Sequence, residues 1–130
     1  MRKLKIVTLA VAALGMSMAA NAQSKYGETP DDSVACISNV SLYQEFYKQK
    51  AYADCYEPWR QILIHCPRFG KSVYQRGEVI MKNMINSAAN TEERNAYIDE
   101  LMRMYDQRIQ YFGEAAMVKA KKAKDLSDLR

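Results

Sequence analysis

Apolar side chains recur at helical spacing along most of this chain. Between Ala51 and Pro67 they stand at i, i+3, i+4, i+7, i+10, i+11 and i+14, the stripe of an amphipathic helix: Tyr52, Cys55, Tyr56, Trp59, Ile62, Leu63 and Cys66. Pro58 lies inside this stripe, and an interior proline removes a backbone hydrogen bond at a cost of about 3 kcal/mol. We therefore expect packing along this helix to offset that cost.

Another helix is expected directly before this one. It begins near Val34, because Asp32 or Ser33 can accept a hydrogen bond from the free amides of its first turn. The polar run Lys48–Lys50 interrupts the apolar pattern, which resumes at Ala51. The sequence therefore predicts two antiparallel helices joined by a short turn.

Three more helical segments follow Pro67, which ends the helix described first. One lies within Arg68–Ser87, and the next begins at Asn90, where Glu93 completes a capping box. Gly113 ends that helix, and a last segment rich in alanine and lysine follows it. No strand-like alternation of useful length occurs after the N-terminal segment. The pattern therefore predicts an all-α fold of about five helices.

The N-terminus has the pattern of a secretory signal peptide. Basic residues precede an apolar run at Ile6–Leu14, and small residues follow at Ala20 and Ala22. This run is shorter than the roughly 20 residues that span a bilayer, which argues against a membrane anchor. We expect cleavage before Gln23 and no transmembrane segment afterwards. The expected organisation is a signal peptide over residues 1–22, a polar lead over 23–33 and a helical repeat domain over 34–130.

Removal of the signal peptide changes the charge balance. The full chain has 19 Lys and Arg against 15 Asp and Glu, but three of the basic residues lie in the signal peptide. The mature chain is then nearly neutral, which gives no reason to expect nucleic acid as a partner. Its length suits one small domain.

The three cysteines of an exported chain suggest one disulfide, and three pairings exist. The helical pattern selects one of them. With Lys50 as the turn, Cys36 lies 14 residues before it and Cys66 lies 16 residues after it. Antiparallel helices bring these two level, so we predict a Cys36–Cys66 disulfide and a free, buried Cys55.

Several of these residues resemble the signature of the tetratricopeptide repeat (TPR), a helix-turn-helix unit of about 34 residues. Cys55 stands where the family has a small residue, Trp59 where it has a large aromatic residue and Pro67 at the closing proline. Gly77 occupies the small site of the next repeat. The matched positions are Leu42, Phe46, Cys55, Trp59, Ile62, Pro67, Gly77 and Ile80.

The chain departs from the family pattern at Tyr43, where a small residue is usual, and in a longer turn around residues 86–94. The resemblance covers residues 34 to about 129 and implies a TPR-like α-solenoid. It consists of one good repeat, one repeat with an insertion and the first helix of a third. That last helix is either the cap of the array or the front of a further repeat.

The resemblance also implies a binding surface, because the first helix of each TPR lines a concave groove where partners bind. Tyrosine and methionine there suit an extended or helical peptide. The alternative for these positions is packing against neighbouring helices or exposure to water. The implied groove residues are Ile37, Val40, Gln44, Tyr47, Lys48, Tyr74, Glu78, Met81, Lys82, Met117 and Lys121.

Residues that could carry chemistry are few. His65 is the single histidine and neighbours Cys66, but a metal site needs further ligands at suitable spacing. Asp99, Glu100 and Asp106 alternate with arginines and are expected to form a solvated, charge-mixed face. The lysines of the last segment spread around its circumference and indicate solubility. We expect no catalytic residue, no metal and no cofactor.

The sequence thus favours an exported, non-enzymatic TPR-like scaffold or adaptor that binds another protein or peptide in the cell envelope. The periplasm is the expected compartment, with secretion or outer-membrane association as alternatives. The alternative function is a small helical periplasmic ligand-binding protein or enzyme that uses the tyrosine- and methionine-lined groove. An open groove favours the first function, and a deep closed pocket with perturbed ionisable groups favours the second.

Overall fold

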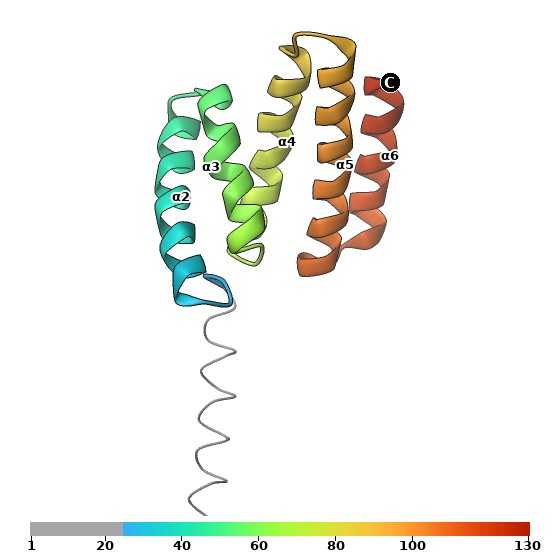
Figure 1. The fold of residues 1–130 in the computed structure, drawn as a ribbon. Coiled ribbons are helices and arrows are strands. Elements are labelled where there is room, and N and C mark those ends of the chain that lie inside the picture. The colour runs from blue at the N-terminus through green and yellow to red at the C-terminus, as the bar shows by residue number, and fades with distance from the viewer. Residues whose placement is uncertain (1–24) are drawn as a thin grey trace, which may run out of the picture.

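The computed structural model describes residues 25–130 and folds them into five helices that follow one another across the molecule (Figure 1). No strand occurs among these residues, so the predicted all-α fold of about five helices is confirmed. The predicted signal peptide lies outside the described residues. The helices are α2 at Pro30–Lys48, α3 at Tyr52–His65, α4 at Lys71–Asn86, α5 at Thr91–Phe112 and α6 at Ala115–Leu129.

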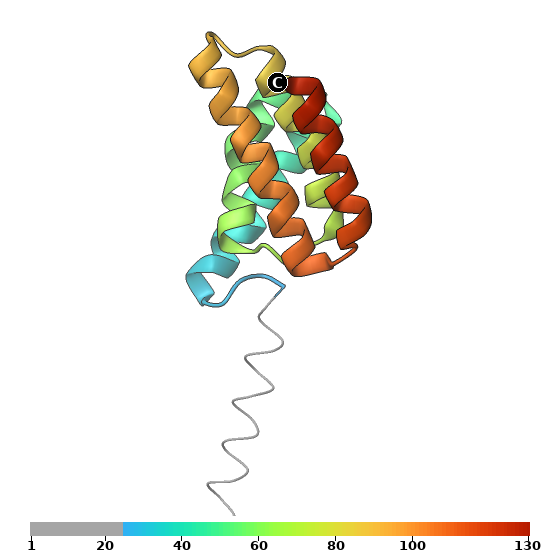
Figure 2. The same ribbon diagram turned by 90° about the vertical axis from the view of Figure 1, so that its right-hand side faces the viewer.

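Each helix packs against the next one along the chain, and the chain reverses direction at every turn (Figures 1 and 2). Side chains also link helices that are not consecutive, namely α2 with α4, α4 with α6 and α3 with α5. Arg76 of α4 lies over tyrosine rings of α2, and Lys121 of α6 pairs with Glu78 of α4. Gln107 of α5 donates a hydrogen bond to the carbonyl of Leu63 in α3. One side of the molecule is therefore built from α2, α4 and α6, and the other from α3 and α5.

Helix α2 begins four residues earlier than predicted, at Pro30. Its cap is Thr29, whose hydroxyl oxygen accepts a hydrogen bond from the Asp32 amide at 3.1 Å, and proline suits the first turn because no amide is needed there. The predicted caps are wrong, because the Asp32 carboxylate lies 2.8 Å from Nδ1 of His65 instead. This hydrogen bond holds the pKa of Asp32 below its usual value.

The turn between α4 and α5 is shorter than the sequence suggests. It comprises only residues 87–90, because α5 starts at Thr91 and runs for 22 residues. Asn90 accepts a hydrogen bond from the Glu93 amide at 2.8 Å, as a capping box requires. The Glu93 carboxylate reaches the Ala89 amide at 2.6 Å rather than that of Asn90. Gly113, with φ of 70°, ends α5 as predicted.

Helices α3, α4 and α5 meet at Gly77. A Cβ atom there would lie 2.6 Å from Cζ2 of Trp59 and 2.6 Å from Sδ of Met104. The Trp59 side chain is fully buried, and its Nε1 donates a hydrogen bond to the carbonyl of Val73 at 2.9 Å. The three helices can approach this closely only because position 77 has no side chain.

The variant Gly77→Ala should lower the free energy of unfolding by about 1–3 kcal/mol, because the added methyl overlaps the Trp59 ring and the Met104 sulfur. Equilibrium unfolding in denaturant measures this loss. Gly70→Ala is the control, since a Cβ at Gly70 would meet only the Ser72 hydroxyl, at 3.7 Å. Equal losses in the two variants would contradict the tight contact at Gly77.

The positions that carry the TPR resemblance differ in burial. Leu42 is 48% exposed and is not the core residue that a signature position implies. The reason is that α2 turns its neighbour Tyr43 inward, where only 1% of that residue remains exposed. Phe46 is partly buried against the core. The buried members of the set are Cys55, Trp59, Ile62, Gly77 and Ile80.

The structure contains the predicted disulfide between Cys36 of α2 and Cys66 at the end of α3, with the two Cα atoms 5.8 Å apart. Lys50 lies at the turn between these helices and has a positive φ of 58°. Cys55 is free and fully buried. Burial raises the pKa of the Cys55 thiol to about 11, which keeps it protonated and unreactive at neutral pH.

Reduction of the disulfide should destabilise the protein by roughly 3–4 kcal/mol, because the bond closes a loop of about 30 residues in the unfolded chain. Unfolding of oxidised and reduced protein in denaturant measures the difference. The Cys55→Ala variant should keep that difference, and Cys36→Ala/Cys66→Ala should remove it. A bridge to Cys55 in the mass spectrum of the non-reduced protein would contradict this pairing.

Candidate binding site between helices α2 and α4

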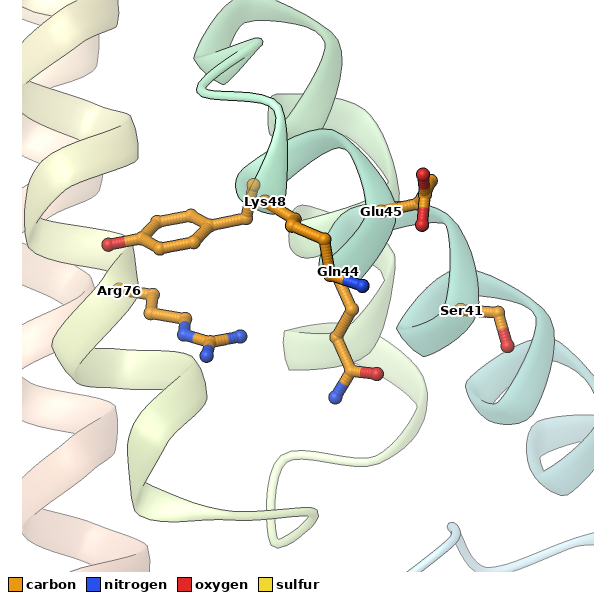
Figure 3. A pocket seen from close by; sticks show the side chains of 6 residues that line it. Ser41, Gln44, Glu45, Lys48 and Arg76 are labelled. Atoms are coloured by element: carbon orange, nitrogen blue, oxygen red, sulfur yellow. The ribbon is translucent and has the colours of Figure 1, made fainter.

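A solvent-open hollow of about 530 Å³ lies between α2 and α4 (Figure 3). The side chains from α2 lie along one side of that helix because they are three or four residues apart. Helix α4 contributes a single arginine, which points toward α2. The residues that line the hollow are Ser41, Gln44, Glu45, Tyr47, Lys48 and Arg76.

Arg76 is held in place by two tyrosines of α2. Its guanidinium carbon lies 4.7 Å from the centre of the Tyr47 ring and 5.9 Å from that of the Tyr43 ring, distances at which a cation is attracted to an aromatic face. Its Nη1 also lies 3.4 Å from the Tyr43 hydroxyl, to which it donates a hydrogen bond. Tyr47 in turn packs edge-on against Tyr52 at the start of α3. Burial raises the pKa of Tyr47, so its phenol stays neutral beside the arginine.

The hollow has an excess of positive charge. Within residues 25–130, neither Arg76 nor Lys48 has a carboxylate oxygen within 4.0 Å, whereas most other cations of α4 and α6 do. Glu45 also lines the hollow, but it turns away from Arg76 (Figure 3) and accepts a hydrogen bond from Gln49. The guanidinium therefore remains free to pair with a carboxylate from outside the chain.

The structure brings three of the eleven predicted groove residues into this hollow, namely Gln44, Tyr47 and Lys48. Two further predicted groove residues, Ile37 of α2 and Met117 of α6, do not line the hollow but are exposed, at 57% and 40%. These five residues therefore remain accessible to a partner.

Three other groove residues are buried and cannot touch a partner. Val40, Tyr74 and Met81 are 8%, 1% and 0% exposed. The Tyr74 hydroxyl donates a hydrogen bond to the carbonyl of Pro67 at 2.7 Å, and burial raises the pKa of Tyr74 to about 12. The prediction that these three residues line the groove is wrong, because they belong to the hydrophobic core.

The remaining groove residues join α4 to α5 and α6. Glu78 pairs with Lys121 at 3.2 Å, and Lys82 pairs with Asp125 at 3.1 Å. The Tyr105 hydroxyl lies 2.5 Å from Asp125 and 3.0 Å from Glu78. Burial raises the pKa of Tyr105, and the hydrogen bond to Asp125 raises it further. This part of the predicted groove is therefore neutralised by the protein's own charges.

Arg108 of α5 lies beneath this network and is 2% exposed. Its Nη1 is 3.6 Å from Glu78, close enough for an ion pair but too long for a hydrogen bond. Its Nε and Nη1 accordingly have no hydrogen-bond partner. Glu78 therefore lies beside two cations, Arg108 and Lys121, and also accepts a hydrogen bond from the Tyr105 hydroxyl.

Asp125→Ala should lower the free energy of unfolding by about 1–3 kcal/mol, because it leaves the buried Tyr105 hydroxyl and Lys82 without this acceptor. Asp128→Ala is the matched control in α6. Asp128 pairs with Lys124 on the exposed surface, and its loss should cost less than about 0.5 kcal/mol. Equal costs, measured by denaturant unfolding, would contradict a supporting role of Asp125.

The three acidic residues of α5 that the sequence singled out are ion-paired. Asp99 pairs with Arg130, and Asp106 pairs with Lys122. Glu100 departs from the expected solvated face, because its side chain is only 18% exposed and accepts a hydrogen bond from Tyr56 at 2.5 Å. Burial raises the pKa of Tyr56, and the bond to Glu100 raises it further. Glu100 therefore ties α5 to α3.

His65 ends α3, and its Nδ1 lies 2.8 Å from a carboxylate oxygen of Asp32 in α2. Sequence reasoning missed this pair, since the two residues are 33 positions apart. It also missed Arg76, because its contacts with Tyr43 and Tyr47 of α2 depend on how α4 lies beside α2. No three His, Cys, Asp or Glu side chains come together as a metal site within residues 25–130.

Comparison with protein-family models, curated proteins and solved structures gives no match. Among the helices of residues 25–130, none is long and apolar enough to cross a membrane. What the chain binds is therefore inferred from its own side chains.

Proposed function

We propose that this protein is an exported, non-enzymatic scaffold or adaptor of TPR-like type that binds another protein in the cell envelope. The observation that carries the proposal is the open hollow between α2 and α4, with Arg76 fixed against tyrosine rings. A hollow open along two helices suits a segment of a partner protein better than an enclosed small molecule.

The TPR-like part of the proposal is supported by packing. Gly77 lies against Trp59, which is the kind of contact that a small residue in one repeat and a large aromatic in the preceding one would make. Pro67 follows α3 directly after Cys66, where the resemblance has a closing proline. Export is supported by the signal-like N-terminal sequence, and the Cys36–Cys66 disulfide suits an oxidising compartment.

The side chains of the hollow also indicate the chemistry of the bound segment. Arg76 has a planar guanidinium that can form two parallel hydrogen bonds with one carboxylate. Stacking on Tyr47 fixes its orientation, so less conformational entropy is lost on binding. Gln44 and Ser41 line the same hollow and can hydrogen-bond to an extended backbone. The expected partner segment is extended and carries an acidic side chain.

Photo-cross-linking in intact cells tests this proposal. A photoreactive amino acid at Gln44, in the hollow, should form a discrete adduct with another protein. The same amino acid at Ser127, an exposed position on α6, is the control and should not form that adduct. The Arg76→Gln variant should lower the yield of the Gln44 adduct about tenfold, the loss expected for one charge-assisted bidentate pair.

Two results would contradict the proposal. Equal adducts from Gln44 and Ser127 would show that proximity to the hollow is irrelevant. No protein adduct at Gln44, together with a small molecule that co-purifies with the wild-type protein and not with Arg76→Gln, would favour a ligand-binding protein or enzyme.

A further inference from the structure

The α3 and α5 side of the molecule also has a depression in its surface. Three adjoining hollows of about 340, 230 and 350 Å³ lie along it. Ile64 lines all three hollows. Arg103 and Gln107 line the first and the second, and Gln110 and Tyr111 line the first and the third. Because neighbouring hollows share these walls, they form one continuous surface, which we call the α3–α5 groove.

Ile64 is the apolar centre of this groove. It is 59% exposed, while its neighbour Ile62 is 1% exposed and forms part of the core. A single exposed isoleucine is ordinary on a protein surface. This one lies where three hollows meet, so it offers an apolar contact to whatever occupies the groove.

Most acidic residues of the groove have an ion-pair partner among the described residues, whereas two of its arginines do not. The acidic residues pair as follows: Glu100 with Arg60, Asp106 with Lys122 and Asp32 with His65. Within residues 25–130, neither Arg103 nor Arg68 has a carboxylate oxygen within 4.0 Å. Only Glu28, at the N-terminal end, lines the groove as an acid without such a partner in the same residues.

Arg68 is additionally held over the ring of Tyr111, with its guanidinium carbon 5.4 Å from the ring centre. This stacking fixes one of the two arginines at one end of the groove. Arg103 stands on α5 nearer the other end, where it lines the hollows around Leu63 and Ile64. The groove therefore presents two guanidinium groups with an apolar contact between them.

We propose that the α3–α5 groove is a second protein-binding surface, and that it takes an acidic segment with an apolar anchor side chain. The anchor packs on Ile64, and flanking carboxylates pair with Arg103 and Arg68. The exposed amide of Gln110 hydrogen-bonds to the backbone of the segment. Since this groove lies on the side opposite the α2–α4 hollow, one copy of the chain can join two partners.

Nuclear magnetic resonance titration of the mature protein tests this inference with a short probe, the capped peptide Ac-Glu-Phe-Glu-NH2. Saturable shifts are expected at the Ile64 methyl groups and at Nε–H of Arg103. The peptide Ac-Gln-Phe-Gln-NH2 lacks the charges and should bind about tenfold more weakly. Ac-Glu-Ala-Glu-NH2 lacks the aromatic anchor and should also bind more weakly.

Variants at exposed positions separate this groove from the other hollow. Ile64→Ser and Arg103→Gln should each weaken binding of Ac-Glu-Phe-Glu-NH2 about fivefold or more while the spectrum of the core stays unchanged. Arg76→Gln removes an arginine on the opposite side and should leave these shifts intact.

Several outcomes would overturn the inference. Equal binding of the Glu and Gln peptides would exclude carboxylate recognition, and shifts confined to Gln44 and Arg76 would place the acidic segment elsewhere. No shift at Ile64 up to the solubility limit of the peptide would exclude the surface. Shifts at Ile64 on simple concentration of the protein, abolished by Ile64→Ser, would make the groove a contact between two copies of the chain instead.

Discussion

The close approach of three helices at Gly77 is the contact on which the rest of the structure depends. The Trp59 side chain is fully buried beside it, and its only polar atom bonds the carbonyl of Val73, so a large aromatic area is buried without leaving a donor unpaired. This also explains why α3 stays helical through Pro58. The proline stands directly before Trp59, where packing is tightest and can offset the lost hydrogen bond.

The same contact makes the two sides of the molecule different. Close packing of α4 against α3 and α5 leaves Arg76 beside α2, where tyrosine rings hold it without a carboxylate. Toward α6, in contrast, the charged residues of α4 are used within the chain, since Glu78 and Lys82 pair with residues of α6. Free positive charge therefore remains at the α2 end and along α3 and α5, around Arg103.

The helices and the disulfide could be predicted from the sequence because each follows from local periodicity or from distance along the chain. The binding residues could be predicted only in part, because which side of a helix faces water depends on its rotation about its own axis. Rotation of α2 decides, for example, that Leu42 is 48% exposed while its neighbour Tyr43 is buried. Tertiary packing sets that rotation, and the sequence pattern does not contain it. The Asp32–His65 pair was missed for a related reason. It depends on tertiary packing, which brings together two residues that are 33 positions apart in the chain.

The two ends of the helix series are held by different forces. Helices α2 and α3 are joined covalently through Cys66, whereas α6 has Val118 as its one fully buried apolar residue and attaches largely through ion pairs. Ion pairs near the surface weaken with salt, and a disulfide does not. The two disulfide-linked helices contribute residues to both proposed binding surfaces. Arg76 lies against α2, and Ile64 stands two residues before the disulfide. A partner on either side would therefore meet helices that the disulfide already joins, so little conformational entropy is lost when the partner binds.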